Sequence, residues 1–528
     1  MAQKELRTML QGALILTAAS FIAKLLSAVY RVPFQNLVGD EGFYVYQQVY
    51  PIYGIAMTLA LTGLPQFISK IVAEQESVSG KKQVLQRLFP FIALLGVSGF
   101  AFFFIGSDWL AWLMGDSDLS PLIKVVAFTF LLVPILSCYR GNFQGHLLMT
   151  PSAVSQVLEQ LIRVGVILTA AWCYQTFQWN VYKTGTAAMG GAVLGGIAAT
   201  GILWYYDRKI QPGSSAYFLR WQIDKEGRTL FYRLFVEGGL VSLYSAFLII
   251  FQLVDSFFVK NALVFSGLPD HAAKVDKGVY DRGQPLVQLG LVVALALSSS
   301  FLPALTKYFV SKQENQFIMA SRMFLRLTTT VATAASVGLV LVLPYINFAL
   351  FKDYKGNGVL GIYVFAIALM AVIQAYQSIL QSRNQFNTAF LAAGLGLLGK
   401  ILLTNPMTQY LGTAGASLST ILSLSVTLFC LIITTGSEIN QFWFERGFLK
   451  KLLSSLGIMI ATLLIYQGIL SIIVGVVDHR GQALLFAIVG VAIGVAAFLA
   501  AIVQLQLFTV REWLMVPFGK KILRIKKR

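Results

Sequence analysis

Two cations seven residues apart stand inside an otherwise apolar stretch near the start of the chain. The segment AKLLSAVYRVPF, residues 23–34, carries Lys24 and Arg31. A helix turns 100° per residue, so positions i and i+7 lie on nearly one face, about 10 Å apart along the axis. A cation at the centre of a membrane helix costs roughly 2.5–3.5 kcal/mol to insert, so it needs a compensating partner. We expect this stripe to face a cavity and to bind an anion.

Few other ionisable residues stand within long apolar runs, and each requires an explanation. They are Glu159, Arg163, Glu237, Asp255, Lys400 and the adjacent pair Asp281 and Arg282. Glu159 and Arg163 are spaced i, i+4, which predicts an ion pair along one helix. Asp255 is either a carboxylate for a coupling ion or the partner of a basic neighbour.

The predicted substrate-binding residues are Lys24, Arg31 and Arg282, which would line an electropositive pocket. The carboxylates of Asp255 and Asp281 would partly neutralise the positive charge of this pocket. For Arg31 the alternative is an anchor whose long side chain reaches the outer membrane interface.

Composition indicates an integral membrane protein. Of the 528 residues, 57% are hydrophobic and 12% are charged, and the mean hydropathy is +0.71. The net charge of +18 is typical of cytoplasmic loops on membrane proteins, so we expect no nucleic-acid partner. The three cysteines lie in apolar segments without CxxC spacing, which predicts neither disulfides nor a zinc site. We expect no metal and no cofactor.

Fourteen apolar segments are long enough to span a bilayer, which predicts an all-α membrane fold. They fall near 11–37, 43–69, 88–106, 121–139, 152–174, 186–206, 234–259, 283–306, 327–350, 359–380, 388–404, 411–435, 452–476 and 482–508.

Lysine and arginine gather in alternate loops, which predicts that both termini are cytoplasmic. The inside set includes Arg140 and the tail KKILRIKKR, whereas the outside set includes GDEG at 39–42 and DHR at 478–480. The predicted location is the cytoplasmic membrane.

The chain resembles itself at an offset near 237 residues. Tyr139 falls on Tyr376 and Arg163 on Lys400, and YQQVYP at 46–51 resembles YDRGQP at 280–285. An offset of six helices relates two lobes of like orientation. We therefore predict a six-helix lobe over 1–210, a second over 229–436, two additional helices over 449–510 and a basic cytoplasmic tail over 511–528.

Prolines occupy matching places in the two predicted lobes. They are Pro51 and Pro65 in the second span and Pro285 and Pro303 in the eighth, and we expect the resulting kinks to line the cavity. The motifs GAVLG at 191–195 and GVAIG at 490–494 predict close helix packing. GLGLLGK at 394–400 has isoleucine where a phosphate-binding loop needs Ser or Thr, so no ATP site is predicted.

The start of the chain resembles SpoVB-type members of the multidrug/oligosaccharidyl-lipid/polysaccharide (MOP) exporter superfamily, near the MurJ lipid II flippases. The resemblance lies in KLLSAVYRVPFQNLVGDEGFYVYQQVYPIYG and in the later segment GLPQFISKIVAE. YDRGQPLVQLG resembles the eighth helix of that group. The resemblance implies two six-helix lobes that move an undecaprenyl-pyrophosphate-linked sugar across the membrane by alternating access. It also implies that Arg31 and Arg282 line the cavity, although Val32 stands where the family has Asp.

Three other functions stay open at this point. A cation-coupled multidrug exporter of the same superfamily would need a carboxylate-rich cavity. An integral membrane glycosyltransferase would need acids and bases in large external loops, and the external loops here are short. A scaffold leaves Lys24 unexplained. For a flippase, either a coupling ion or the membrane potential, worth about 2.3 kcal/mol per charge per 100 mV, would supply the driving force.

Overall fold

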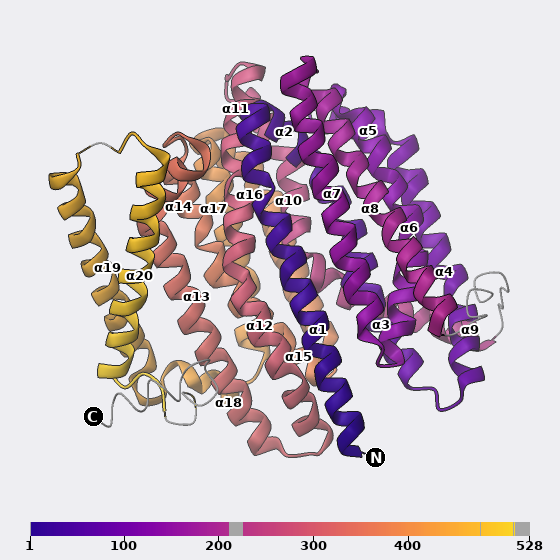
Figure 1. Cartoon of the computed structure of the whole chain (residues 1–528). Helices are drawn as coiled ribbons and strands as arrows, with labels where there is room; N and C mark the ends of the chain where they lie inside the picture. The colour runs from indigo at the N-terminus through magenta and orange to yellow at the C-terminus, as the bar shows by residue number, and fades with distance from the viewer. Residues whose placement is uncertain (1, 211–224, 476, 510–511, 513–528) are drawn as a thin grey trace. The chain divides into compact units, whose positions relative to one another are not determined.

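The computed structural model describes residues 2–210, 225–475, 477–509 and 512, and the regular elements in those ranges are helices (Figure 1). Contacts divide the chain into two compact units. The first comprises Met1–Asp281 with Ile401–Ala416, and the second comprises Arg282–Lys400 with Ser417–Arg528. The predicted basic tail over 511–528 lies outside the described residues, apart from residue 512.

The first unit contains the helices that precede Arg282. In chain order they are α1 (Ala2–Val29), α2 (Arg31–Thr58), η1 (Leu59–Gly63), α3 (Leu64–Ala73), α4 (Val78–Ile105), α5 (Ser107–Leu113), η2 (Ser117–Leu119), α6 (Ser120–Gly145), α7 (Met149–Phe177), α8 (Val181–Ile210), α9 (Lys225–Arg233), η4 (Leu234–Gly238), α10 (Gly239–Phe265) and α11 (Asp270–Asp281).

The second unit follows, and α16 and the start of α17 are divided between the units. Its helices are α12 (Gly283–Val310), α13 (Glu314–Phe351), α14 (Asn357–Val364), α15 (Ala366–Ser382), α16 (Phe386–Leu411), α17 (Thr413–Thr434), α18 (Ser437–Asn440), η5 (Gln441–Trp443), η6 (Glu445–Gly447), α19 (Phe448–Ile473) and α20 (Arg480–Gln504).

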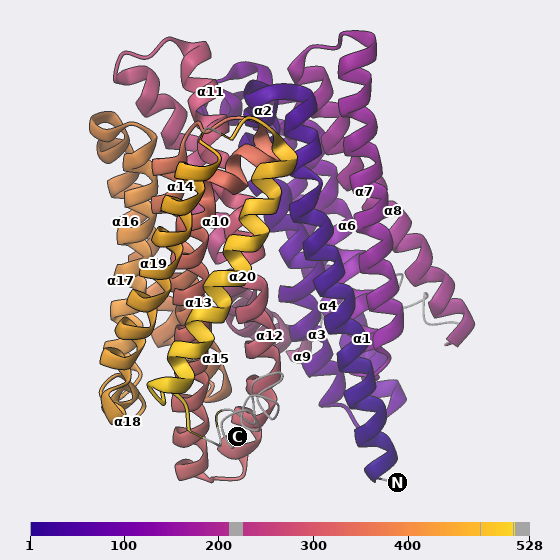
Figure 2. The same ribbon diagram turned by 60° about the vertical axis from the view of Figure 1, so that its left-hand side comes forward.

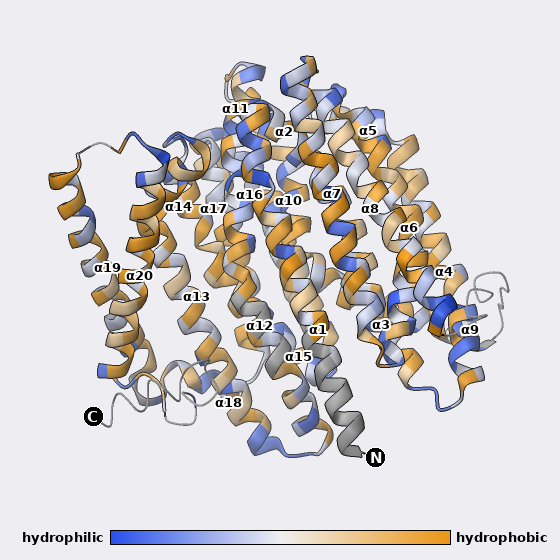
Figure 3. Cartoon of the chain, viewed as in Figure 1, coloured by the Kyte–Doolittle hydropathy of each residue, from blue (hydrophilic) through white to orange (hydrophobic). Residues whose placement is uncertain are grey.

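Twelve helical segments of the described residues are long and apolar enough to cross a membrane. The first, Ile15–Ala73, is 59 residues long and includes most of α1 together with α2, η1 and α3, whereas α12 is not among the twelve. Apolar residues run along the lengths of the helices, as Figure 3 shows for α19 and α20. The all-α membrane fold is confirmed, and the count of fourteen spans stays a prediction.

The first predicted span is interrupted close to Arg31. Helix α1 ends at Val29 and α2 begins at Arg31, because Pro33 has no N–H to donate to the carbonyl of Val29. The intervening Tyr30 keeps helical φ and ψ values of −61° and −25°. The predicted loop at 39–42 is reduced to a kink at Gly39, which joins two helices within α2 and whose φ of 75° favours glycine.

The prolines lie within three helices, and one of them follows a π-helical turn. Pro51 lies inside α2, and Pro65 lies in the first turn of α3, directly after the π-helical turn η1. Pro303 lies inside α12, and Pro285 lies near its start. The prediction that these positions line a cavity stays a prediction.

Glycines allow two pairs of helices to pack closely, as the GxxxG motifs predict. Helices α7 and α8 lie side by side in both views (Figures 1 and 2). A methyl group at Gly195 would lie 2.6 Å from the carbonyl oxygen of Glu159, and one at Gly191 would lie 2.9 Å from that of Arg163. A methyl group at Gly494 of α20 would lie 3.1 Å from Cδ1 of Leu463 in α19. Close packing at both motifs is thus confirmed.

Candidate functional site

Helix α7 carries a polar stripe on its buried face. Gln156, Glu159, Gln160 and Arg163 occupy positions i, i+3, i+4 and i+7, which share one face of a helix, and all four are buried. Helix α1 covers part of the stripe, since the Ser20 hydroxyl donates to Oε1 of Gln156 at 3.1 Å. The sequence therefore places a polar surface inside the first unit.

Glu159 pairs with Arg140 of α6, so the predicted ion pair between Glu159 and Arg163 is wrong. Nη2 of Arg140 lies 2.7 Å from Oε2 of Glu159. Its other donors reach the Ser155 hydroxyl and the carbonyl oxygen of Ala60, each at 3.1 Å. The assignment of Arg140 to a cytoplasmic loop is also wrong, because the residue lies in α6 and its buried side chain donates to three acceptors.

Arg163 instead points toward the junction of α1 and α2. Its Nη2 donates to the Ser27 hydroxyl at 3.1 Å and to Oε1 of Gln160 at 2.8 Å. Its Cζ lies over the rings of Tyr30 and Tyr53, at 5.2 and 4.8 Å from their centroids. The remaining nitrogens, Nε and Nη1, are buried and make no hydrogen bond.

Arg31 is fully buried in the first unit, at 0% exposure. Its Cζ lies 4.4 Å from the centroid of the Tyr50 ring, the Tyr30 hydroxyl is a further neighbour, and the three guanidinium nitrogens have no hydrogen-bond partner of good geometry. This environment disfavours the interfacial-anchor alternative, because such an anchor would extend its charge out of the protein.

Four tyrosines, which we call the tyrosine cluster, surround the two arginines: Tyr30, Tyr46, Tyr50 and Tyr53. All four are at most 2% exposed, and the hydroxyls of Tyr30 and Tyr46 are 2.9 Å apart. Ring centroids are separated by 6.2 Å for Tyr46 and Tyr50 and by 5.9 Å for Tyr50 and Tyr53. The last three occupy positions i, i+4 and i+7 of α2, a spacing that could have revealed the cluster from the sequence.

Lys24 differs from Arg31 in its surroundings. Its side chain is exposed, and it makes no hydrogen bond or ion pair with any residue in the described part of the chain. The two members of the predicted stripe therefore differ in burial, and a cavity common to both stays a prediction.

Asp255 and Asp281 lie among buried partners on α10 and α11. The Tyr280 hydroxyl donates to Oδ2 of Asp255 at 2.8 Å, and the ammonium of Lys277 lies 2.6 Å from Oδ1 of Asp281. Burial raises the pKa of Asp281 to about 6, although the Lys277 charge opposes the rise. A role for either carboxylate in ion coupling stays a prediction.

Two further lysines of this region belong to an ionic network that the sequence analysis did not single out. Lys260 pairs with Asp270, and Lys274 lies 2.9 Å from Asp270 and 3.3 Å from Asp116. Burial alone would raise the pKa of Asp270, but hydrogen bonds from the two lysines outweigh it and hold the pKa below its usual range. These contacts attach α11 to neighbouring parts of the first unit.

Arg282, in the second unit, forms a bidentate ion pair with Asp353. Its Nη1 and Nη2 lie 2.6 and 3.0 Å from the two carboxylate oxygens. Burial would raise the pKa of Asp353, but the bonds from Arg282 and the backbone N–H of Lys355 hold it below its usual range. Asp353 was not foreseen as the partner of Arg282. A pocket common to Arg31 and Arg282 stays a prediction, since the two residues belong to different units.

Lys400, the predicted repeat counterpart of Arg163, is likewise buried. Its ammonium donates to the hydroxyls of Ser419 and Thr420 at 3.1 and 2.7 Å. A cation held by neutral side chains thus occurs at both matched positions, in α7 and in α16.

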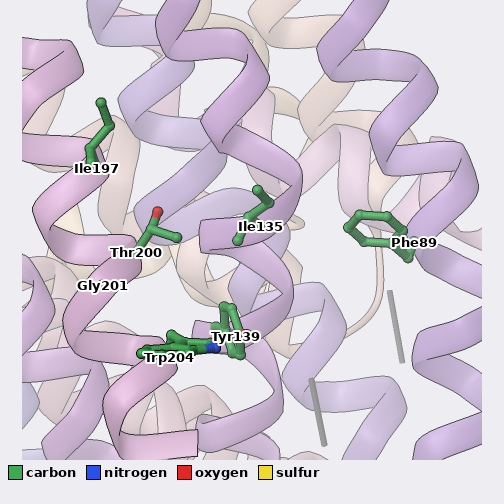
Figure 4. Close-up of a pocket in the computed structure, with 7 residues that line it drawn as sticks. All are labelled: Phe89, Ile135, Tyr139, Ile197, Thr200, Gly201 and Trp204. Carbon is green, nitrogen blue, oxygen red and sulfur yellow. The ribbon is translucent and has the colours of Figure 1, made fainter. Parts of the chain in front are cut away.

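An apolar hollow of about 490 Å³ lies in the first unit, among α4, α6 and α8 (Figure 4). Its lining includes Phe89, Tyr139 and Trp204, with Thr200 as a hydroxyl-bearing neighbour. It contains no charged side chain and is distinct from the arginines above. Within the described residues, no group of three His, Cys, Asp or Glu side chains is arranged to hold a metal ion.

A scan of protein families finds a match over residues 9–309 to the family described as polysaccharide biosynthesis protein. The chain belongs to this family. It is 34% identical to uncharacterized membrane protein YabM of Bacillus subtilis (strain 168), over 98% of this chain and 96% of the relative. It is also 26% identical to the lipid II flippase MurJ of the same organism, over 93% and 94% of the two chains.

The fold agrees with the family assignment. A solved structure of the lipid II flippase MurJ in an inward closed conformation matches with a TM-score of 0.67, at 14% identity, over 92% of this chain and 98% of that one. With twelve candidate spans in its described residues, this member of the family is a multi-pass membrane protein with bacterial relatives. The predicted resemblance is confirmed.

Proposed function

We propose that this protein is a flippase that moves an undecaprenyl-pyrophosphate-linked cell-wall precursor, either lipid II or a polysaccharide repeat unit, across the bacterial cytoplasmic membrane by alternating access. The observation that carries the proposal is Arg31, a fully buried guanidinium that forms no ion pair with any described residue. Burying a charge away from water costs several kcal/mol even after the protein relaxes, so an anionic ligand beside Arg31 would be favoured. The planar fork of arginine fits phosphate oxygens.

The similarity to a protein named lipid II flippase supports a lipid-linked substrate. Within the proposal, Lys24, Arg31 and Arg282 contact the pyrophosphate, and Arg282 exchanges Asp353 for the substrate when it does so. Pro51, Pro65, Pro285 and Pro303 belong to the helices whose movement opens the cavity.

The proposal also includes the membrane arrangement predicted from the sequence. Fourteen crossings result if the 59-residue segment Ile15–Ala73 crosses twice and α12 crosses once. Both termini are then cytoplasmic, with six-helix lobes over 1–210 and 229–436 and two further helices over 449–510. The membrane potential or a coupling ion drives the movement of the anionic headgroup outward.

The decisive experiment measures flipping of a fluorescent lipid-linked precursor by the purified protein in proteoliposomes. Arg31→Ala and Arg282→Ala should each reduce flipping to the level of empty liposomes, whereas Arg208→Ala, at an exposed arginine, should transport normally. Normal transport by both test variants would overturn the proposal.

Growth of a strain depleted of its lipid II flippase, when it expresses this protein, would identify peptidoglycan synthesis as the pathway.

A multidrug exporter is the second candidate, and the buried cations weigh against it. A site for cationic drugs requires carboxylates, whereas Arg31 and Arg163 place positive charge in the first unit. Drug resistance conferred by the wild-type protein and retained by Arg31→Ala would favour the exporter.

A further inference from the structure

Arg163 is a buried cation for which the proposed substrate contacts give no role. Its side chain is 1% exposed, yet Nε and Nη1 make no hydrogen bond, and only Nη2 is held, by Ser27 and Gln160. No carboxylate in the described part of the chain lies within ion-pair distance of it. Both of its hydrogen-bonding partners are neutral, so its charge is not balanced by them.

The tyrosine cluster stabilises the charge without using its donors. A guanidinium is planar, and an aromatic ring interacts with its face, whereas the N–H groups point outward in the plane. Arg163 lies over Tyr30 and Tyr53, and Arg31 lies over Tyr50. The rings cover the faces of both guanidinium groups, so N–H groups at their edges can still donate to an acceptor.

The same cluster also connects the two arginines through contacts between its rings and hydroxyls. Tyr30 contacts Arg163 and shares a hydroxyl contact with Tyr46, whereas Tyr50, which contacts Arg31, packs on Tyr53. Two like charges in one buried cluster repel each other, and low dielectric strengthens the repulsion. An anion with several oxygens would relieve this repulsion and would satisfy the unbonded donors.

We propose that Arg31 and Arg163 together bind one phosphate-like oxyanion inside the first unit, with Ser27 and Gln160 holding Arg163 in position. The inference rests on the proposed function where Arg31 is concerned, and it deepens that function by adding a second guanidinium from α7. Oxygens of the ligand accept bonds from Nε and Nη1 of Arg163 and from the fork of Arg31. The same chemistry is presented by a lipid-linked diphosphate and by free inorganic pyrophosphate.

The test is calorimetric titration of sodium pyrophosphate into the full-length protein in lipid nanodiscs at constant ionic strength. Arg163→Gln and Arg31→Gln should each weaken binding about tenfold or more, because each removes a charge-assisted contact. Arg208→Gln makes the same change at an exposed arginine and should bind like the wild type. Gln160→Leu, which removes an acceptor that holds Arg163, should weaken binding severalfold and provides a second test if Arg163→Gln does not fold.

Undecaprenyl pyrophosphate in the nanodisc distinguishes the two sources of the ligand. If undecaprenyl pyrophosphate competes with inorganic pyrophosphate and the competition depends on both arginines, the site binds the lipid headgroup. If inorganic pyrophosphate binds and the lipid does not compete with it, the site binds a free anion. Both outcomes support the site. Wild-type protein that binds neither ligand, or Arg163→Gln that binds as tightly as wild type, overturns it.

Flipping assays separate this inference from the proposed function. If Arg31→Ala abolishes flipping while Arg163→Gln both flips and binds normally, the function stands and the two-arginine site is rejected. If pyrophosphate binding depends on both arginines while the wild type flips no lipid-linked precursor, the site stands and the function is rejected.

Discussion

Arg140 and Glu159 form a buried ion pair in the first unit, with 2.7 Å between Nη2 and Oε2. The pair joins α6 to the polar stripe of α7. Arg140 also bonds the carbonyl oxygen of Ala60, which lies in the π-helical turn η1. A buried carbonyl needs a donor, and π turns disturb the regular hydrogen bonds of a helix. The arginine therefore stabilises the irregular end of α2 as well as the contact between α6 and α7.

Substitution at either member of this pair should destabilise the protein. We expect Arg140→Gln or Glu159→Gln to lower the free energy of unfolding by about 3–5 kcal/mol, because the remaining charge is left buried and unpaired. The double variant Arg140→Met with Glu159→Leu should lose less than the sum of the single changes. Unfolding of the detergent-solubilised protein, followed by circular dichroism, measures both quantities.

The exposed pair of Lys124 and Asp108, at 3.3 Å, provides the control. Lys124→Gln should cost less than about 1 kcal/mol, because solvent screens an exposed pair. Equal losses at Arg140 and Lys124 would mean that the buried pair has no special structural role.

The same pair shows what the sequence could and could not predict. Spacing along one helix associates Glu159 with Arg163, whereas the actual partner, Arg140, comes from another helix and is chosen by tertiary packing. Asp353 was missed as the partner of Arg282 for the same reason. Charges are visible in a sequence, but which opposite charge they meet depends on contacts between segments far apart in the chain.

Periodicity and glycine spacing were more informative, because they depend on one helix at a time. Apolar runs predicted the all-α membrane fold, and GAVLG predicted the close approach of α8 to α7. The i, i+4, i+7 tyrosines of α2 carry a signal of the same kind. The interruption at Tyr30 was less predictable. Pro33 removes only the hydrogen bond to the carbonyl of Val29, four residues earlier, and the backbone at Tyr30 stays close to helical.

Asp353→Asn should destabilise the second unit without abolishing transport. Removal of this carboxylate leaves Arg282 buried without its bidentate partner, and we expect a loss of about 1–3 kcal/mol in the free energy of unfolding. Flipping should persist, because the proposed substrate replaces Asp353 at Arg282, whereas Arg282→Ala should be inactive. Thermal unfolding and the proteoliposome assay measure the two effects on the same preparations.

Asp478→Asn, which changes an exposed aspartate in the same unit, is the matched control for Asp353. It should alter neither stability nor transport. An Asp353→Asn variant as stable as this control would show that the ion pair with Arg282 contributes nothing.

Asp281 should make stability depend on pH between about pH 4 and pH 6. Its pKa is raised from about 3.9 in unfolded chains to about 6, so the folded state favours the protonated carboxyl. The associated stability is fully present below the unfolded value and is lost as the pH rises through about 6. Melting temperatures measured between pH 4 and about pH 8 should therefore contain a falling contribution that Asp281→Asn removes.

The matched change for this prediction is Asp118→Asn at an exposed aspartate of the same unit. Its melting temperature should follow the wild-type pH profile. Asp281→Asn should resemble the wild type most closely at the acid end, where the wild-type carboxyl is also neutral, and should not share the loss of stability as the pH rises through about 6. A pH profile of Asp281→Asn that parallels the wild type would contradict the assignment.

Gly278 allows α11 to lie against α2, and alanine there should separate the two helices. A methyl group at Gly278 would overlap the carbonyl oxygen of Asp40 and lie 2.9 Å from its carbonyl carbon. Backbone atoms cannot turn aside as a flexible side chain can, so we expect a loss of about 1–3 kcal/mol. Gly239→Ala, in α10, is the matched control, since a methyl group there meets nothing within 4 Å and alanine favours the helix. The melting temperature should fall for Gly278→Ala and stay equal or rise for Gly239→Ala; equal values for both variants would show that the contact between α11 and α2 is not held closely.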